Sequence, residues 1–117
     1  MVGLSDAISE HPYNLTYGQR KMLCIASVLA MRPEIIILDE PTGTADPLTR
    51  MEIVRSIKNS RDNLNQSYMI ISHDIDFIKA VCDRTVLMAG GKLIAIGDPD
   101  TVIDKFKEIE AKAQFHA

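Results

Sequence analysis

The 117-residue sequence has only two cysteines and no long uninterrupted apolar segment. Cys24 and Cys82 stand far apart in apolar helical contexts, without a Cys-x-x-Cys spacing or a histidine cluster. This pattern argues against metal-binding or redox roles and predicts two buried free thiols. No stretch approaches the roughly 20 apolar residues of a transmembrane helix, and no charged-then-apolar leader opens the chain. We therefore expect a cytoplasmic protein.

The sequence also lacks a basic excess and a phosphate-binding glycine loop. Its net charge of −3 provides no electrostatic footprint for nucleic acid, so nucleic acid is not expected as a partner. With 46% hydrophobic and 25% charged residues, the composition is that of an ordinary globular protein with room for one small domain. No G-x-x-x-x-G-K-[ST] sequence occurs, so the backbone cradle and lysine that hold β- and γ-phosphates are missing.

The most informative feature present is an apolar strand that ends in two acids. Residues 35–38 are Ile-Ile-Ile-Leu, and Asp39 and Glu40 follow directly. A continuous apolar run of this length predicts a central strand of a parallel sheet, buried on both faces. Ligands of open α/β sheets bind beyond the carboxyl ends of the strands, and paired carboxylates there suit metal-assisted phosphoryl transfer. The plain alternative is a strand that simply exits into a polar loop.

Three further motifs accompany this strand. Residues 15–19 read Leu-Thr-Tyr-Gly-Gln before an apolar helical run, residues 43–46 read Gly-Thr-Ala-Asp, and His73 follows a second apolar strand. In order and spacing, these segments resemble the signature motif, the Walker B strand (residues 35–40), the D-loop and the switch histidine of ABC-type ATPases. The resemblance extends from Val2 to about Ile103.

The resemblance implies an α/β protein with the three-layer, P-loop NTPase-like fold and a parallel sheet. The phosphate loop, the adenine-stacking aromatic residue and the glutamine loop of the family cannot be placed. We therefore expect an incomplete fold: the C-terminal half of an ABC ATPase domain over residues 1–103, followed by a helical tail over residues 104–117. Such a chain is a gene fragment, a truncation or a stand-alone relic, inactive alone and poorly soluble because its sheet is cut at an apolar edge.

The resemblance also assigns roles at the strand ends. Glu40 is implied as the base or water-orienting carboxylate, and His73 as the residue that contacts the γ-phosphate and keeps the water and Glu40 in register. Asp39 is implied to hold Mg²⁺ through a water molecule, so ATP and Mg²⁺ are the expected cofactors. An isolated histidine at a strand end is otherwise an ordinary polar residue.

Nucleotide contacts are implied for Thr16, Gly18, Gln19 and Asp46. In the family, the signature turn closes over the γ-phosphate held by a second module in a head-to-tail pair, within one chain or in a dimer. Asp46 is implied to communicate across that interface and also to cap a helix that begins at Pro47. Tyr17 replaces a family glycine, so we expect ordinary dihedral angles there. The simpler alternative makes Thr16 only a helix N-cap.

Periodicity and turn residues place the remaining elements. The apolar residues Met22, Ile25, Ala26 and Leu29 predict a helix over residues 18–31, and Met51, Val54 and Ile57 are expected on the inner face of the Pro47 helix. The Pro47 helix is expected to end within residues 59–66, and a buried strand is expected over residues 67–72. A helix capped by Asp74 follows. Residues 84–88 and 92–96 should form a hairpin around Gly90-Gly91, and a last helix should begin at Pro99.

Two branches of the family compete for the function. Residues 17–19 and 29–34 resemble the energy-coupling ATPases of cobalt, nickel and vitamin importers. Residues 43–49 and the segments 74–77 and 81–84 resemble the soluble, two-module activation component of methyl-coenzyme M reductase. The Gly43-Thr44 form of the D-loop departs from transporter forms and favours the soluble relative.

The expected function is therefore ATP hydrolysis that drives conformational work, such as activation of methyl-coenzyme M reductase. The first alternative is the ATPase subunit of an ABC or energy-coupling-factor importer, peripheral to a membrane and partnered by a membrane subunit. The second is a non-hydrolysing fragment that supplies its signature motif to a partner module, but the presence of both Glu40 and His73 argues against it.

Overall fold

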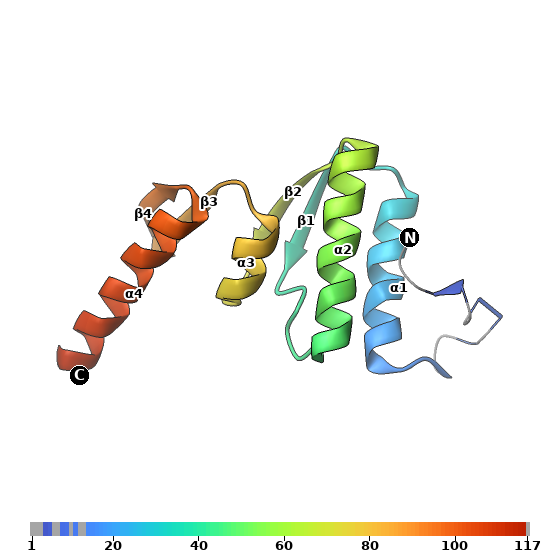
Figure 1. Cartoon of the computed structure of the whole chain (residues 1–117), viewed down its shortest axis with the longest axis horizontal. Helices are drawn as coiled ribbons and strands as arrows, with labels where there is room; N and C mark the ends of the chain where they lie inside the picture. The colour runs from blue at the N-terminus through green and yellow to red at the C-terminus, as the bar shows by residue number, and fades with distance from the viewer. Residues whose placement is uncertain (1–3, 6–7, 10, 12–13, 117) are drawn as a thin grey trace. The chain divides into compact units, whose positions relative to one another are not determined.

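A computed structural model describes residues 4–5, 8–9, 11 and 14–116, apart from the side chains of residues 115 and 116. The chain divides into two compact units, Met1–His73 and Asp74–Ala117, which are described separately. Figure 1 shows the elements: in the first unit α1 (Tyr17–Ala30), β1 (Ile35–Asp39), α2 (Pro47–Leu64) and β2 (Ser67–Ile71), and in the second α3 (Ile75–Val81), β3 (Thr85–Ala89), β4 (Lys92–Gly97) and α4 (Pro99–His116).

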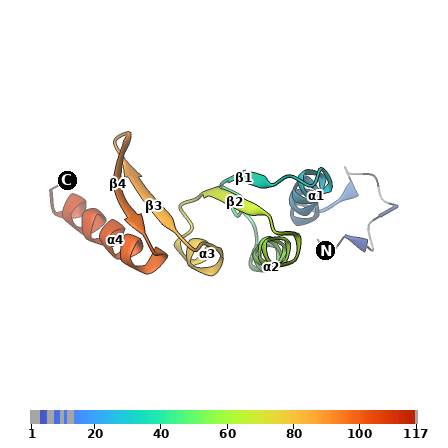
Figure 2. The same ribbon diagram turned by 90° about the horizontal axis from the view of Figure 1, so that it is seen from above.

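The two strands of the first unit are parallel, as the sequence predicted. Ile36 pairs with Tyr68 and Leu38 with Ile70, so these four side chains lie on the same face of the sheet. Ile36 is buried, and Tyr68 reaches a hydroxyl of α2, so this face is the one that packs against the helix. Figure 2 shows α2 beside β2 on this side.

The opposite face of the sheet corrects the prediction of burial on both faces. Ile35 and Ile37 of β1 are 66% and 65% exposed, and Met69 and Ile71 of β2 are 61% and 52% exposed. No described element of the first unit covers this face (Figure 2). A continuous apolar run indicates a strand whose two faces can both be buried. Both faces are buried only where a layer of helices or other elements packs on each side of the sheet.

Helix α2 buries Ile57 as predicted, but the rest of its buried stripe differs from the one expected. Ile53 and Ile57 are fully buried, whereas Met51 is 59% exposed and Val54 is half-buried. Two residues of a helix turn through about 200°, so Met51 lies almost opposite Ile53. The helix ends at Leu64, within the predicted interval of residues 59–66. Asn65 then ends it in the left-handed conformation with φ of 53°.

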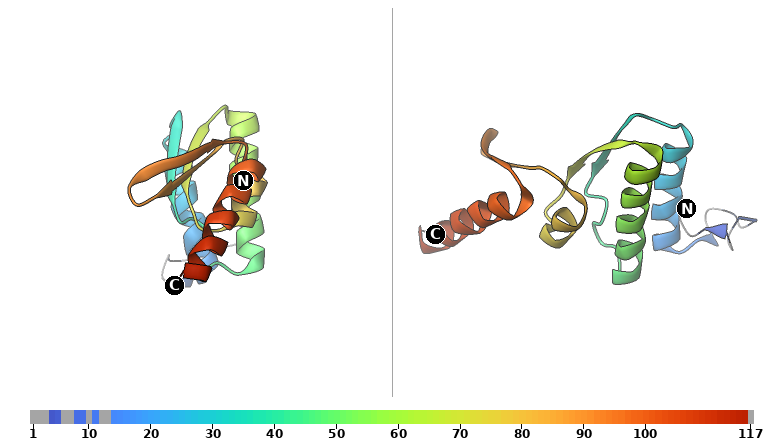
Figure 3. Two further views of the ribbon diagram at one scale, coloured as in Figure 1. Left: turned by 90° about the vertical axis from the view of Figure 1, so that its left-hand side faces the viewer. Right: turned by 45° about the horizontal axis from the view of Figure 1, so that its top comes forward.

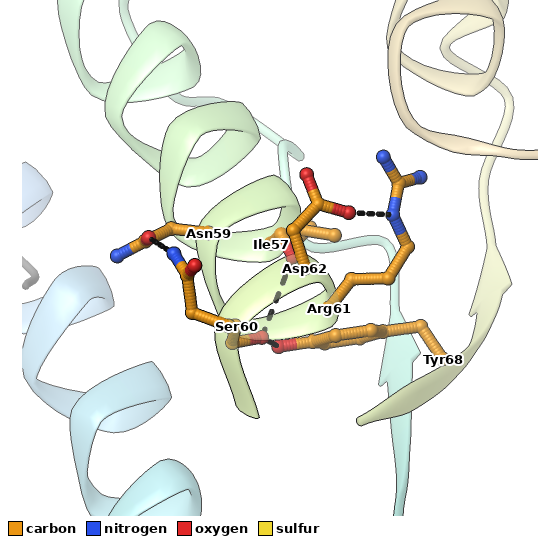
Figure 4. Close-up of polar contacts among 7 residues, drawn as sticks. Ile57, Asn59, Ser60, Arg61, Asp62 and Tyr68 are labelled. Atoms are coloured by element: carbon orange, nitrogen blue, oxygen red, sulfur yellow. Dashed lines mark hydrogen bonds and ion pairs between the residues drawn. The ribbon is translucent and has the colours of Figure 1, made fainter. Parts of the chain in front are cut away.

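A polar contact joins α2 to the sheet at its buried side (Figure 4). The hydroxyls of Ser60 and Tyr68 are hydrogen-bonded, and Ser60 Oγ also donates to the Ile57 carbonyl at 3.3 Å. Burial raises the pKa of the Tyr68 phenol, and the Ser60 hydrogen bond opposes that shift. Since a buried hydroxyl is costly without a partner, this pair fixes where β2 crosses the helix.

Helix α1 packs along α2 through the predicted apolar stripe. Met22, Ile25 and Leu29 are buried. Cys24 lies off this stripe and is exposed, so the prediction of a buried thiol is wrong there. Cys82 is partly buried, and neither cysteine forms a disulfide. At the start of α1, a Cβ on Gly18 would overlap Thr49 Oγ1 of α2, so the glycine permits the close approach of the two helices.

The second unit contains the predicted hairpin and two helices (Figure 3). Strands β3 and β4 are antiparallel, and Gly90 and Gly91 have φ of 56° and 73°, as a two-residue turn of type I′ requires. Asp74 caps α3, as predicted, and Val102 and Ile103 of α4 are buried. Helix α4 runs from Pro99 to His116 and so crosses the boundary expected between the half-domain (residues 1–103) and the helical tail (residues 104–117). That boundary stays a prediction.

The buried stripe of α2 predicts a sharp contrast between neighbouring apolar residues. Ile53→Ala should lower the free energy of unfolding by about 2–5 kcal/mol, because it removes a fully buried side chain. The matched change Met51→Ala should alter it by about 0.5 kcal/mol or less, since that side chain is largely exposed. Urea unfolding followed by circular dichroism measures both, and equal effects would contradict the helix orientation described here.

The contact between Gly18 and Thr49 predicts a clash that a second substitution relieves. Gly18→Ala should destabilise the protein by about 1–3 kcal/mol, because a methyl group has no room beside the buried Thr49. In a Thr49→Ala background, the same change should cost clearly less. Unfolding curves of the two single variants and the double variant give this coupling; strictly additive effects would show that the helices do not meet there.

Candidate functional site

The carboxyl end of β1 holds the two predicted acids in different environments. Asp39 is exposed on the uncovered face of the sheet, whereas Glu40 is partly buried. Glu40 has φ of 49°, a left-handed conformation that costs a non-glycine residue about 1–2 kcal/mol. Its backbone N–H donates to the Ile71 carbonyl at 2.7 Å, and its carbonyl accepts from the Gly43 N–H at 3.2 Å. These two hydrogen bonds hold the unusual backbone in place.

The structure brings Glu40 and His73 together, as the sequence predicted. His73 Nε2 lies 3.4 Å from Glu40 Oε1. Parallel pairing causes this proximity, because β1 and β2 end at the same edge of the sheet and each functional residue follows its strand. The imidazole is 95% exposed and the Glu40 side chain 39% exposed, so both groups are accessible to solvent and to a ligand.

The signature turn forms a complete capping box at the start of α1. Thr16 Oγ1 accepts from the Gln19 N–H at 3.1 Å, and Gln19 Oε1 accepts from the Thr16 N–H at 2.9 Å. Thr16 is therefore the N-cap of α1, and nucleotide contacts by Thr16, Gly18 and Gln19 remain predictions. Tyr17 is helical with negative φ, which confirms the expectation of ordinary dihedral angles at this position.

Tyr17 makes a connection that the sequence reasoning missed. Its hydroxyl accepts a hydrogen bond from Thr44 Oγ1 at 2.9 Å and from Lys21 Nζ at 3.5 Å, and Lys21 Nζ lies 5.5 Å from the centre of its ring. The signature turn and the D-loop are thus in direct contact. The available signal was that Tyr17 and Thr44 are both departures from common family residues, but spacing alone does not pair residues 27 positions apart.

Asp46 caps α2, as predicted from its position before Pro47. Its carboxylate accepts from the Thr49 N–H at 2.9 Å. The hydrogen bonds from Thr49 lower the pKa of the Asp46 carboxyl, which keeps the cap charged at the positive end of the helix. Communication by Asp46 across an interface between modules remains a prediction.

Asp39 is the residue for which the sequence predicts a contact with a metal ion. No group of three or more His, Cys, Asp or Glu side chains among them is arranged to hold a metal. The exposed carboxylate of Asp39 fits a magnesium ion whose other ligands are water and phosphate, as this cation prefers.

Of the helices in the described part of the chain, none has the length and apolar character to cross a membrane.

Comparison with protein families and curated proteins identifies related sequences. A family model described as ABC transporter matches residues 1–43. An uncharacterized ABC transporter ATP-binding protein of Methanocaldococcus jannaschii is 44% identical over 110 residues, which are 94% of this chain and 20% of that protein. The energy-coupling factor transporter ATP-binding protein EcfA2 of Caldanaerobacter subterraneus is 36% identical over 111 residues, which are 94% of this chain and 39% of that protein.

A solved structure gives the same result at the level of the fold. CbiO1 of Clostridium perfringens, part of the ABC transporter complex cbiONQ, superposes with a TM-score of 0.74 and 35% identity. The match covers 91% of this chain and 42% of that protein. The chain therefore spans less than half the length of these relatives. It is homologous to the ATP-binding proteins of ABC transporters, including energy-coupling factor transporter ATPases, and its fold is part of an ABC transporter ATPase domain.

Proposed function

We propose that this chain supplies the water-activating half of an ATP-hydrolysing ABC module. The observation that carries the proposal is the pairing of Glu40 and His73, 3.4 Å apart at the edge where β1 and β2 end. Both groups are accessible, and homology to ABC transporter ATP-binding proteins supports ATP as their ligand. The phosphate-binding glycine loop is not in this sequence, so a second segment must hold the nucleotide phosphates.

The proposed chemistry divides among the residues of the edge. Glu40 orients and deprotonates the attacking water, and His73 contacts the γ-phosphate while its Nε2 keeps the Glu40 carboxylate in position. Asp39 holds Mg²⁺ through a water molecule, and the ion neutralises charge on the phosphates when bound. The signature turn, with Thr16, Gly18 and Gln19, faces the γ-phosphate held by a second module. Asp46 communicates the presence of that nucleotide across the interface of the head-to-tail pair.

Among the branches, the importer ATPase has the better support. The relatives with informative names are transport proteins, among them EcfA2 and a component of the complex cbiONQ, so a membrane transporter subunit is the proposed partner. Activation of methyl-coenzyme M reductase rests only on the sequence resemblance of residues 43–49, 74–77 and 81–84. Nearly the same number of matched residues makes up 20% of the relative from Methanocaldococcus and 39% of EcfA2. The relative from Methanocaldococcus is therefore about twice as long as EcfA2 and has room for two modules in one chain.

The role of Glu40 predicts loss of hydrolysis without loss of binding. In the complete reading frame that carries this chain, Glu40→Gln should lower kcat by about 10²–10⁴-fold, because the amide cannot accept the proton of the attacking water. Binding of a fluorescent ATP analogue should change little. Glu34→Gln, at the amino end of the same strand, is the matched control and should retain activity. Undiminished hydrolysis by the Glu40 variant would remove the basis of the proposal.

The role of His73 predicts an effect that depends on Glu40. His73→Ala should lower kcat by about 10²-fold, since it removes the group that keeps the attacking water and the Glu40 carboxylate in register. The double variant with Glu40→Gln should be no slower than Glu40→Gln alone, because the two side chains act on one water molecule. Single-turnover ATP hydrolysis measures all three proteins. A further, multiplicative loss in the double variant would show that the two residues act independently.

A further inference from the structure

The Tyr17 hydroxyl lies between two segments that the proposed mechanism treats separately. It stands at the first residue of α1, in the signature turn, and accepts a 2.9 Å hydrogen bond from Thr44 Oγ1 in the loop after Glu40. Lys21, one helical turn further along α1, donates to the same oxygen at 3.5 Å. One phenolic oxygen thereby receives hydrogen bonds from both segments.

The loop that Thr44 belongs to is held at both of its ends. On the side of the catalytic edge, the Gly43 N–H donates to the Glu40 carbonyl at 3.2 Å, and the Ala45 N–H donates to the Thr42 carbonyl at 2.8 Å. On the other side, Asp46 caps α2. The contact with Tyr17 adds the third connection, from the middle of the loop to the signature turn.

Glu40 gives this third connection its importance. A left-handed backbone at a non-glycine residue persists only where the surrounding contacts fix it. The Glu40 backbone makes two hydrogen bonds. Its N–H donates to the carbonyl of Ile71 in β2, and its carbonyl accepts from the N–H of Gly43 in the following turn. A change in the position of this turn therefore changes the direction in which the Glu40 carboxylate points.

We propose that Tyr17 is a positioning residue for ATP hydrolysis: by accepting the hydrogen bond of Thr44, it fixes the loop after Glu40 against the signature turn and so orients the Glu40 carboxylate. This inference rests on the function proposed above. The contact would link two nucleotide sites of the head-to-tail pair. The signature turn faces the nucleotide of the second module, and the Glu40 carboxylate activates water at the other nucleotide; Tyr17, Thr44 and Glu40 of one module connect them. Hydrogen bonds from Thr44 and then from Lys21 lower the pKa of the Tyr17 phenol, as this contact requires.

Removal of either hydroxyl tests the inference. In the complete reading frame, Tyr17→Phe and Thr44→Val should each lower kcat about three- to tenfold, the worth of one hydrogen bond, with the KM for ATP nearly unchanged. The double variant should be no slower than either single variant, because both remove the same contact. Thr44→Ser keeps the hydroxyl and should restore kcat. Circular dichroism and urea unfolding verify that each variant folds.

The outcomes separate this inference from the proposed function. If the unsubstituted protein hydrolyses ATP and Glu40→Gln abolishes it, unchanged kcat or multiplicative losses in the Tyr17 and Thr44 variants would overturn the positioning role alone. If the unsubstituted protein is inactive, the proposed function fails and the positioning role fails with it. The contact itself has an independent readout, the pKa of Tyr17 from carbon-13 NMR of labelled tyrosine rings. Thr44→Val should raise that pKa, and an unchanged value would show that the hydrogen bond does not form in solution.

Discussion

Parallel pairing between β1 and β2 is the constraint on which the candidate site depends. Asp39 pairs with Ile71, and the next backbone N–H, that of Glu40, donates to the Ile71 carbonyl at 2.7 Å. This hydrogen bond extends the ladder one residue beyond the strand and places Glu40 where His73 can reach it. Because side chains alternate along a strand, a slip of one residue would move Glu40 to the other side of the sheet and separate the pair.

A second constraint is the junction at Thr49, which ties the signature turn to the start of α2. Its side chain occupies the space beside Gly18, and its backbone N–H serves the Asp46 cap. The first interaction requires a residue without a Cβ in α1, and the second requires a carboxylate immediately before Pro47. Together with the hydrogen bond from Thr44 to Tyr17, they join the signature turn and the D-loop through direct contacts, so a shift of one segment would disturb the other.

Local patterns in the sequence predicted most elements, and contacts between distant residues account for the errors. The Gly90-Gly91 turn, the Asp46 cap and the stripe of α1 follow from backbone rules that act over a few residues, and the proximity of Glu40 and His73 follows from the rule for parallel strand ends. Met51 and Cys24 are apolar enough for either face of a helix, so composition alone could not orient them. No periodic pattern relates Tyr17 to Thr44, because that contact depends on how α1 packs against α2.

The uncovered sheet face connects stability to function. Full burial of a side chain such as Ile35 or Ile37 is worth about 1.5–3 kcal/mol, and the first unit by itself does not gain most of that free energy. A two-stranded sheet has little stability of its own, so the edge that holds Glu40 and His73 is supported mainly from the side of α2. In CbiO1, more than half of the protein lies outside the matched region. A segment that covered Ile37 and Ile71 would bury two exposed side chains near the edge that holds Glu40 and His73, and would rigidify that edge without contacting it. The nucleotide chemistry proposed for Glu40 would then be sensitive to whatever occupies this face, even if the covering segment supplied no catalytic side chain.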